Sequence, residues 1–205
     1  MQDQKNALII FQKNMVLGKV KTRLAATVGD NAALEIYREL VAYTHAVCNE
    51  VKADKWLFFS DELIASEKTS YQHYHYATQS GKDLGARMLQ AFTHCFDQGY
   101  EKVLIIGTDC AELSSEILET AYKALDDHEV VIGPAADGGY YMLGMRHLYA
   151  DLFAAIPWST DQVLYLTEQA LQKQRVSYQK LAVLSDIDNE NDWNQYKHLI
   201  HQNNE

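Results

Sequence analysis

Short apolar runs and longer amphipathic stretches alternate along the chain. The runs at 7–11, 103–107 and 130–133 consist almost entirely of Ala, Val, Leu, Ile, Phe and Gly, which is typical of strands that are buried on both faces. Further strand or apolar segments are predicted at 56–59, 71–77, 140–144 and within 176–184. The sequence therefore predicts a sheet of mostly interior strands.

Between these runs, apolar residues recur at every third or fourth position, which is the spacing of one helix face. This pattern predicts helices at 30–51, 84–96, 114–125, 160–173 and 190–201. Asp30 is expected to cap the first of them, and Ser114 or Ser115 the third. Strands that alternate with helices at this spacing favour a single α/β domain over residues 1–205, with helices on both faces of a mostly parallel sheet.

Composition and charge narrow the function classes. The 205 residues are 47% hydrophobic and 22% charged, with 18 Lys and Arg against 28 Asp and Glu and a net charge of −10. Such an acidic chain lacks the basic face that nucleic acid binding needs. The three cysteines form no CxxC pair, so reduced thiols are expected rather than a zinc ribbon. The polar start and short first apolar run predict a cytoplasmic protein without a membrane span.

The loop after the first apolar run carries an unusual local excess of positive charge. Gly18 and Thr22 accompany three cations, Lys19, Lys21 and Arg23. Cations clustered against the overall field indicate an anionic ligand, and phosphate oxygens match Lys, Arg and free backbone amides. The loop contains neither GxxxxGK[ST] nor GxGxxG. The alternative interpretation is a solvated basic turn.

Asp109 lies two residues after the apolar run 103–107, at the edge of the sheet where ligands bind in open α/β folds. A carboxylate there can ligate Mg²⁺ or Mn²⁺ on a phosphate, or it can cap the next turn. Its neighbour Cys110 has no obvious base partner, which favours a buried, unreactive thiol.

The sequence from Asp137 to Tyr140 contains two consecutive glycines, Gly138 and Gly139. Without side chains, these glycines let the backbone approach a ligand closely. Asp137 and the tyrosine ring could then meet a sugar or an acceptor. The alternative is a simple hairpin turn.

Asp186 and Asp188 follow the last predicted strand, and either could contribute a second metal ligand. Helix capping by Asp188 or Asn189 is the alternative.

Asp83, Gly85 and Arg87 lie at the start of a predicted helix, where anions bind readily, although Asp83 could equally be the helix cap. His73 and His75 have no third ligand nearby, which favours packing or surface positions over a metal site.

Taken in order, six motifs resemble the bacterial DUF2064 family of predicted glycosyltransferases. The resemblance extends from about Ala7 to Trp193. Its motifs are Gly18-x-Val-Lys-Thr-Arg-Leu24, Gln79-x-Gly-x-Asp-Leu-Gly-x-Arg-Met88, Ile106-Gly-Thr-Asp-Cys110, Gly133-Pro-Ala-x-Asp-Gly-Gly-Tyr-Tyr141, Ile156-Pro-Trp-Ser-Thr160 and Asp186-Ile-Asp188.

The resemblance implies a three-layer α/β/α domain with a mixed, mostly parallel sheet, the nucleotide-diphospho-sugar transferase (GT-A) fold. It implies Mg²⁺ or Mn²⁺ on Asp109 and Asp188, and catalytic roles for Asp109 and Asp137. Nucleotide phosphates would contact Gly18, Lys19, Lys21, Thr22, Arg23, Asp83, Gly85 and Arg87, whereas the sugar or acceptor would face Gly138, Gly139, Tyr140 and Trp158.

Three functions remain open from the sequence. The first is glycosyl transfer from a nucleotide-diphosphate sugar to a small-molecule acceptor. The second is nucleotidyl transfer from an NTP to a small phosphorylated acceptor, with release of pyrophosphate. The third is non-catalytic nucleotide binding. The residues do not specify the base, the acceptor or the oligomeric state. In all three cases, replacing Lys21 or Arg23 by Ala is expected to weaken nucleotide binding and to leave stability nearly unchanged.

Overall fold

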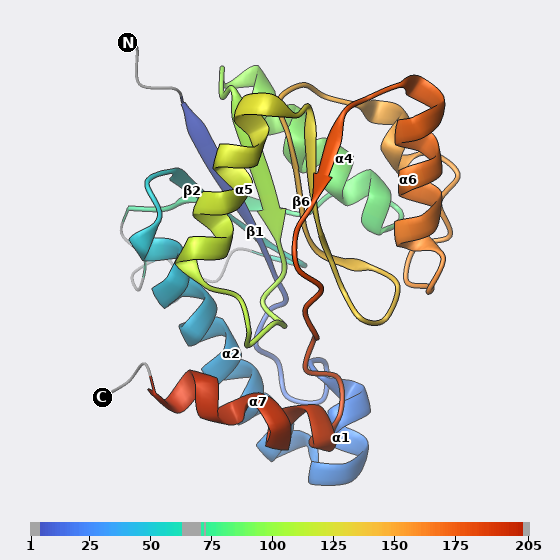
Figure 1. Cartoon of the computed structure of the whole chain (residues 1–205). Helices are drawn as coiled ribbons and strands as arrows, with labels where there is room; N and C mark the ends of the chain where they lie inside the picture. Colours follow the sequence, from blue (N-terminus) through green and yellow to red (C-terminus); the bar gives the residue numbers. More distant parts are fainter. Residues whose placement is uncertain (1–4, 63–70, 72, 203–205) are drawn as a thin grey trace.

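The structure is a computed structural model that describes residues 5–62, 71 and 73–202 (Figure 1). One sheet contains seven strands, β1 (Asn6–Gln12), β2 (Asp54–Phe59), β3 (His75–Thr78), β4 (Lys102–Ile106), β5 (Val130–Pro134), β6 (Tyr140–Met145) and β7 (Tyr178–Lys180). Their order across the sheet is β3-β2-β1-β4-β6-β5-β7. β6 runs antiparallel to both of its neighbours, and the other pairs are parallel. The sheet is therefore mixed and mostly parallel, as predicted.

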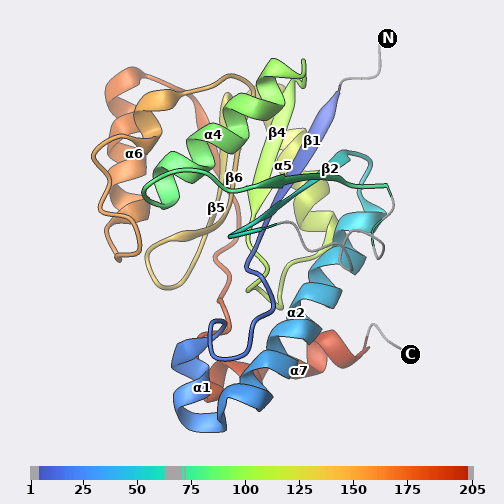
Figure 2. The ribbon, with the colours of Figure 1, turned by 180° about the vertical axis from the view of Figure 1, so that it is seen from behind.

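Helices cover both faces of the sheet. They are α1 (Thr22–Val28), α2 (Asp30–Glu50), α4 (Leu84–Asp97), α5 (Ser115–Asp127), the 3-10 helix η1 (Ala150–Phe153), α6 (Val163–Gln174) and α7 (Glu190–Gln202). α4, η1 and α6 pack on one face, and α2, α5 and α7 contribute to the core on the other. Figures 1 and 2 show these layers, with α1 and α7 gathered beyond the end of the sheet. The predicted three-layer α/β/α architecture is confirmed.

Alternate residues of each central strand point into different cores. In β1, Leu8 and Ile10 belong to the core beside α2 and α5, whereas Ala7 and Ile9 belong to the core beside α4. Successive strand residues face opposite sides of a sheet, so a strand covered on both faces needs apolar residues at every position. This requirement explains why the interior strands were visible as continuous apolar runs.

Several element boundaries differ from the predictions. The strand expected at 71–77 is only His75–Thr78, and the one expected within 176–184 is Tyr178–Lys180 with an isolated bridge from Leu184 to Ala135. The expected capping by Asp30 is wrong, because Gly29 occupies the cap position with φ 83° and no side-chain cap bond forms. Ser114, in contrast, caps α5 as predicted by accepting from the Ile117 amide.

All three cysteines are buried and free of disulfides, as expected. Burial raises the pKa of the Cys110 thiol to about 12, which makes it a poor nucleophile. No helix within the described residues combines the length and apolar character needed to cross a bilayer.

A histidine is buried between α2 and the strands. His45 is 1% exposed, and its Nε2 lies 2.8 Å from Gln12 Oε1. Because an amide oxygen only accepts, Nε2 donates this bond. The ring stacks on Tyr71 at a centroid distance of 3.9 Å, and burial lowers the pKa of His45 to about 3.

His45 should make the stability of the protein depend on pH. An unfolded histidine has a pKa of about 6.5, so between that value and about 3 the unfolded chain binds a proton that the folded chain does not. Stability should therefore fall as pH falls below 6.5, by up to about 1.4 kcal/mol per pH unit from this residue. Urea unfolding at pH 7 and pH 5 should show a shallower decline for His45→Gln than for wild type. The exposed His73→Gln is the control, and equal declines in all three proteins would contradict the assignment.

Candidate functional site

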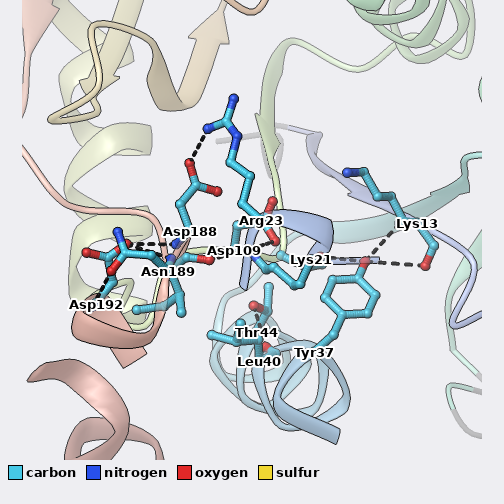
Figure 3. A network of polar contacts seen from close by, with 12 residues as sticks. Lys13, Lys21, Arg23, Tyr37, Leu40, Thr44, Asp109, Asp188, Asn189 and Asp192 are labelled. Atoms are coloured by element: carbon cyan, nitrogen blue, oxygen red, sulfur yellow. Dashed lines mark hydrogen bonds and ion pairs between the residues drawn. The ribbon is translucent and has the colours of Figure 1, made fainter. Parts of the chain in front are cut away.

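The site is organised around one buried ammonium group, that of Lys21. It lies at the end of the loop 13–21 between β1 and α1, which we call the basic loop. Lys21 has a left-handed backbone (φ 47°) and directly precedes α1. Its side chain is 6% exposed, and Nζ lies 2.6 Å from Asp109 Oδ1 and 2.7 Å from the Ile187 carbonyl oxygen. The Ile187 amide in turn donates to the Asp109 carbonyl at 2.9 Å. Three segments that are distant in sequence therefore meet at Lys21 (Figure 3).

A second ion pair lies beside the first. Arg23, in the first turn of α1, places Nη1 2.9 Å from Asp188 Oδ2, with side-chain exposures of 78% and 43%. Helix α7 is capped by Asn189, whose Oδ1 accepts from the amide of Asp192, while Asp192 Oδ2 accepts from the amide of Asn189. This reciprocal arrangement is a capping box. The structure thus assigns the capping to Asn189, and the Asp188 carboxylate faces Arg23.

A buried tyrosine fixes the basic loop to the end of β4. Tyr37 of α2 accepts a hydrogen bond from the Lys13 amide at 2.9 Å, and its hydroxyl lies 3.1 Å from Thr108 Oγ1. Lys13 is exposed and borders the same cavity as Lys21. Lys13 was not among the predicted site residues, although its place directly after β1 was an available signal.

Three adjoining cavities surround these residues. The basic cavity, about 310 Å³, is bordered by Lys13, Lys21, Thr22, Arg23, Tyr37, Asp109 and Asp188. The central cavity, about 410 Å³, shares Lys13, Tyr37 and Asp109 with it. The aromatic cavity, about 400 Å³, includes Trp158 and Tyr140, and it shares Leu84, Tyr140, Ser159 and Asp186 with the central cavity. These shared walls join the three into one depression. Lys19, which is exposed, is not among the described residues that border them.

Asp186, which the sequence offered with Asp188 as a candidate metal ligand, borders both the central and the aromatic cavities. Its pKa is raised to about 7, mainly by burial and then by the negative charge of Asp109, whereas Lys21 opposes the shift. Asp137 and Asp188 add to the negative field. The only sequence signal for Asp186 was its i, i+2 spacing from Asp188 after the last strand.

These carboxylates fit a divalent cation that is shared with a ligand. Carboxylate oxygens are the preferred ligands of Mg²⁺, which is usually held by one or two carboxylates together with substrate phosphates. Burial is the main cause of the raised pKa of Asp186, and the negative charges of Asp109, Asp137 and Asp188 add to it. Within the described residues, no group of three or more His, Cys, Asp or Glu side chains could hold a metal ion. Asp109 and Asp188 would therefore need phosphate oxygens to complete a site.

The residues at the start of α4 serve the fold directly. Asp83 caps α4 by accepting from the Ala86 amide at 2.8 Å. A Cβ atom added to Gly85 would lie 2.1 Å from Trp158 Nε1, so this glycine makes room for the indole ring. Arg87 Nε donates to the Gly81 carbonyl at 3.3 Å, and Arg87 borders the central cavity. Nucleotide contacts of Asp83, Gly85 and Arg87 stay predictions.

The double glycine forms a tight turn between β5 and β6. Asp137 Oδ1 accepts from the Gly139 amide at 2.9 Å, and Gly138 has φ 89°. A Cβ atom on Gly138 would lie 2.4 Å from the Asp161 carbonyl oxygen, so the turn packs closely against the 157–162 loop. The predicted turn is present, and Asp137 and Gly139 border the aromatic cavity. Their contact with a sugar or acceptor stays a prediction.

Two aromatic rings border the same cavity as this turn. Tyr140 and Trp158 meet edge to face at a centroid distance of 6.4 Å. The Tyr140 hydroxyl is buried, and burial raises the pKa of Tyr140. Tyr140 therefore presents its ring to the cavities, whereas its hydroxyl is not available to a ligand there.

The family model described as "Uncharacterized protein conserved in bacteria (DUF2064)" matches residues 43–160. The chain belongs to the DUF2064 family. No curated protein matches the DUF2064 chain.

Solved structures share the fold of this DUF2064 protein. One is from Desulfovibrio desulfuricans G20 and was provisionally named a nucleotide-diphospho-sugar transferase; it is 26% identical, with a TM-score of 0.85 and 98% of each chain covered. A second is 4-diphosphocytidyl-2C-methyl-D-erythritol synthase from Anaerococcus prevotii DSM 20548, with 11% identity, a TM-score of 0.65 and coverage of 98% and 97%. A third is Rv0371c from Mycobacterium tuberculosis H37Rv in complex with manganese, with 12% identity, a TM-score of 0.58 and coverage of 97% and 99%. The last two show the fold alone.

The two ion pairs should differ in their effect on stability, which corrects the expectation that both alanine variants are nearly neutral. Lys21→Ala removes the donor of the Ile187 carbonyl, in a fully buried residue, and of the Asp109 carboxylate, which is 41% exposed. The unpaired carbonyl should cost about 1–3 kcal/mol. Arg23→Ala removes an exposed pair and should change stability by less than about 0.5 kcal/mol. Denaturant unfolding at pH 7 measures both values. Equal destabilisation by the two variants would contradict the central position of Lys21.

Proposed function

We propose that this DUF2064 protein is a transferase that uses a nucleotide-diphosphate sugar. The diphosphate would occupy the basic cavity, and the sugar and acceptor would occupy the aromatic cavity. The observation that carries this proposal is the continuity of the two environments. A cavity bordered by Lys13, Lys21 and Arg23 opens, through walls shared with the central cavity, into one bordered by aromatic rings and carboxylates.

The basic cavity suits a diphosphate. Lys13, Lys21 and Arg23 border it together, and ammonium and guanidinium groups form strong charge-assisted bonds with phosphate oxygens. Asp109 and Asp188 would hold Mg²⁺ or Mn²⁺, which when bound would neutralise negative charge on the diphosphate. The manganese complex of Rv0371c, a protein of similar fold, supports this assignment.

The aromatic cavity suits a sugar and its acceptor. In the transfer, the bond from the anomeric carbon to the diphosphate oxygen breaks, and its electron pair leaves with the nucleoside diphosphate. The acceptor hydroxyl oxygen bonds to that carbon, and its proton passes to a base. Asp137 is our candidate for the base because it borders the cavity and its carboxylate is held on the turn by the Gly139 amide. Lys21 and Arg23 would stabilise the charge that develops on the leaving group.

The second candidate is nucleotidyl transfer. It is favoured by the three cations around the basic cavity, which could balance a triphosphate, and by the similar fold of the Anaerococcus prevotii synthase. In this reaction an acceptor phosphate oxygen bonds to the α-phosphorus of the NTP, and pyrophosphate leaves with the electron pair of the broken bond. Charge neutralisation and positioning would supply most of the catalysis.

Nucleotide binding should depend on Arg23. We expect isothermal titration calorimetry with a panel of nucleotide-diphosphate sugars and NTPs, with and without Mn²⁺, to identify a ligand whose affinity falls about tenfold in Arg23→Ala, since a charge-assisted bond to phosphate is lost. Arg38→Ala is the matched control, because Arg38 is an exposed arginine paired with Glu35 outside the three cavities. Wild-type affinity in Arg23→Ala would contradict phosphate binding in the basic cavity.

The products should separate the candidate reactions. Slow hydrolysis of a bound nucleotide-diphosphate sugar to free sugar supports glycosyl transfer, whereas pyrophosphate release from an NTP supports nucleotidyl transfer. Asp109→Asn should abolish either activity while retaining fold, as checked by circular dichroism. Nucleotide binding without turnover, unchanged in Asp109→Asn, would instead favour a non-catalytic nucleotide-binding protein.

A further inference from the structure

Acidic and basic side chains are unequally distributed around the aromatic cavity. The exposed Asp137 and Asp161 border it, together with the partly buried Asp186. Arg23 is the one basic side chain among the described residues that line this cavity, and its guanidinium is paired with Asp188. A ligand in the aromatic cavity therefore meets carboxylate oxygens and no uncompensated cation of the described lining.

The remaining lining suits a compact, uncharged or positively charged molecule. Trp158 and Tyr140 offer ring surfaces, and aromatic rings attract cations and pack against apolar faces. Ser159 borders both the central and the aromatic cavities and holds φ 65°, a strained backbone for a residue with a side chain. Such strain persists only where surrounding structure enforces it and is common at ligand sites.

The charge of the basic cavity is the opposite. Lys13, Lys21 and Arg23 gather there, so the depression has one end that attracts phosphate and another that repels it. A cavity whose charged groups have the same sign as a ligand repels that ligand, and this repulsion gives specificity by excluding it. The two cavities therefore differ in the ligand chemistry that they select.

We propose that the acceptor is a neutral or amine-bearing hydroxyl compound, and that Asp137 and Asp161 exclude phosphorylated and carboxylated acceptors from the aromatic cavity. This inference rests on the proposed function, because it assigns the acceptor to that cavity. It disfavours the nucleotidyl alternative, which requires a phosphorylated acceptor.

The electrostatic selectivity can be measured without knowing the acceptor. Ser159→Cys places a thiol at the border of the cavity, and Thr160→Cys provides a second position should the first variant fail to fold. Each variant is reacted with two methanethiosulfonates, the cationic trimethylammonium-ethyl reagent and the anionic sulfonato-ethyl reagent. The rate with the cationic reagent is divided by the rate with the anionic one, and this ratio is normalised to the same ratio for free cysteine. We expect the normalised ratio to favour the cationic reagent at least tenfold. Wild type is the blank, because its three cysteines are buried.

Variants then assign the selectivity to its source. In the Ser159→Cys background, Asp137→Asn and Asp161→Asn together should reduce the ratio at least fivefold. Asp151→Asn is the control for net charge, since Asp151 is exposed on η1 and does not border the cavity, and it should leave the ratio unchanged. A normalised ratio near one, or equal ratios in all variants, would overturn the proposal.

The proposed function is tested by a separate experiment. Calorimetry of the same proteins with nucleotide-diphosphate sugars tests the basic cavity. Absence of nucleotide binding together with a high thiol ratio would reject the transferase assignment while confirming the cation-selective cavity. Nucleotide binding together with a ratio near one would support the transferase assignment and reject the cation-selective cavity.

Discussion

The structure of the site depends on the buried ammonium group of Lys21. A charge that is 6% exposed is stable only when its desolvation is compensated by close partners, and here the partners are a carboxylate and a carbonyl. They belong to the loop that follows β4 and to the segment that precedes α7. Because the Ile187 amide also bonds to the Asp109 carbonyl, the ammonium and one backbone bond together bring 21, 109 and 187 to the same point.

This arrangement couples the cations of the site to its acids. Lys21 pairs with Asp109, and Arg23 pairs with Asp188. The pKa of Asp186 is raised by burial first and by the charge of Asp109 second. A phosphate that takes Lys21 leaves Asp109 uncompensated, and a divalent cation that takes Asp109 leaves Lys21 uncompensated. Because the buried Lys21 ammonium is costly without a partner, charge balance would favour binding of both together in the proposed function. The capping box of Asn189 and Asp192 satisfies backbone amides at the start of α7 without the Asp188 carboxylate. The Asp188 carboxylate is therefore left to pair with Arg23.

Much of the fold could be predicted from the sequence because burial on two faces forces continuous apolar runs, as in β1 and β4. The short helix α1 was not predicted, since it follows a left-handed Lys21 without a side-chain cap. Asp188 and Asn189 are adjacent and chemically similar, so only their side-chain directions distinguish the cap from the carboxylate that meets Arg23. The raised pKa of Asp186 was invisible because it arises from burial and from Asp109, far away in sequence.

The glycines show how a correct motif can carry a different physical role. Gly138 was expected to let the backbone approach a ligand, and Gly85 to contact nucleotide phosphates. A Cβ at these positions would collide with the Asp161 backbone and with the Trp158 indole, respectively. Both glycines therefore admit the protein's own 157–162 loop. That loop supplies Trp158, Ser159 and Asp161 to the aromatic cavity, so the glycines shape the ligand site through the wall that packs on them. A side chain at either position would displace this wall before it met any ligand.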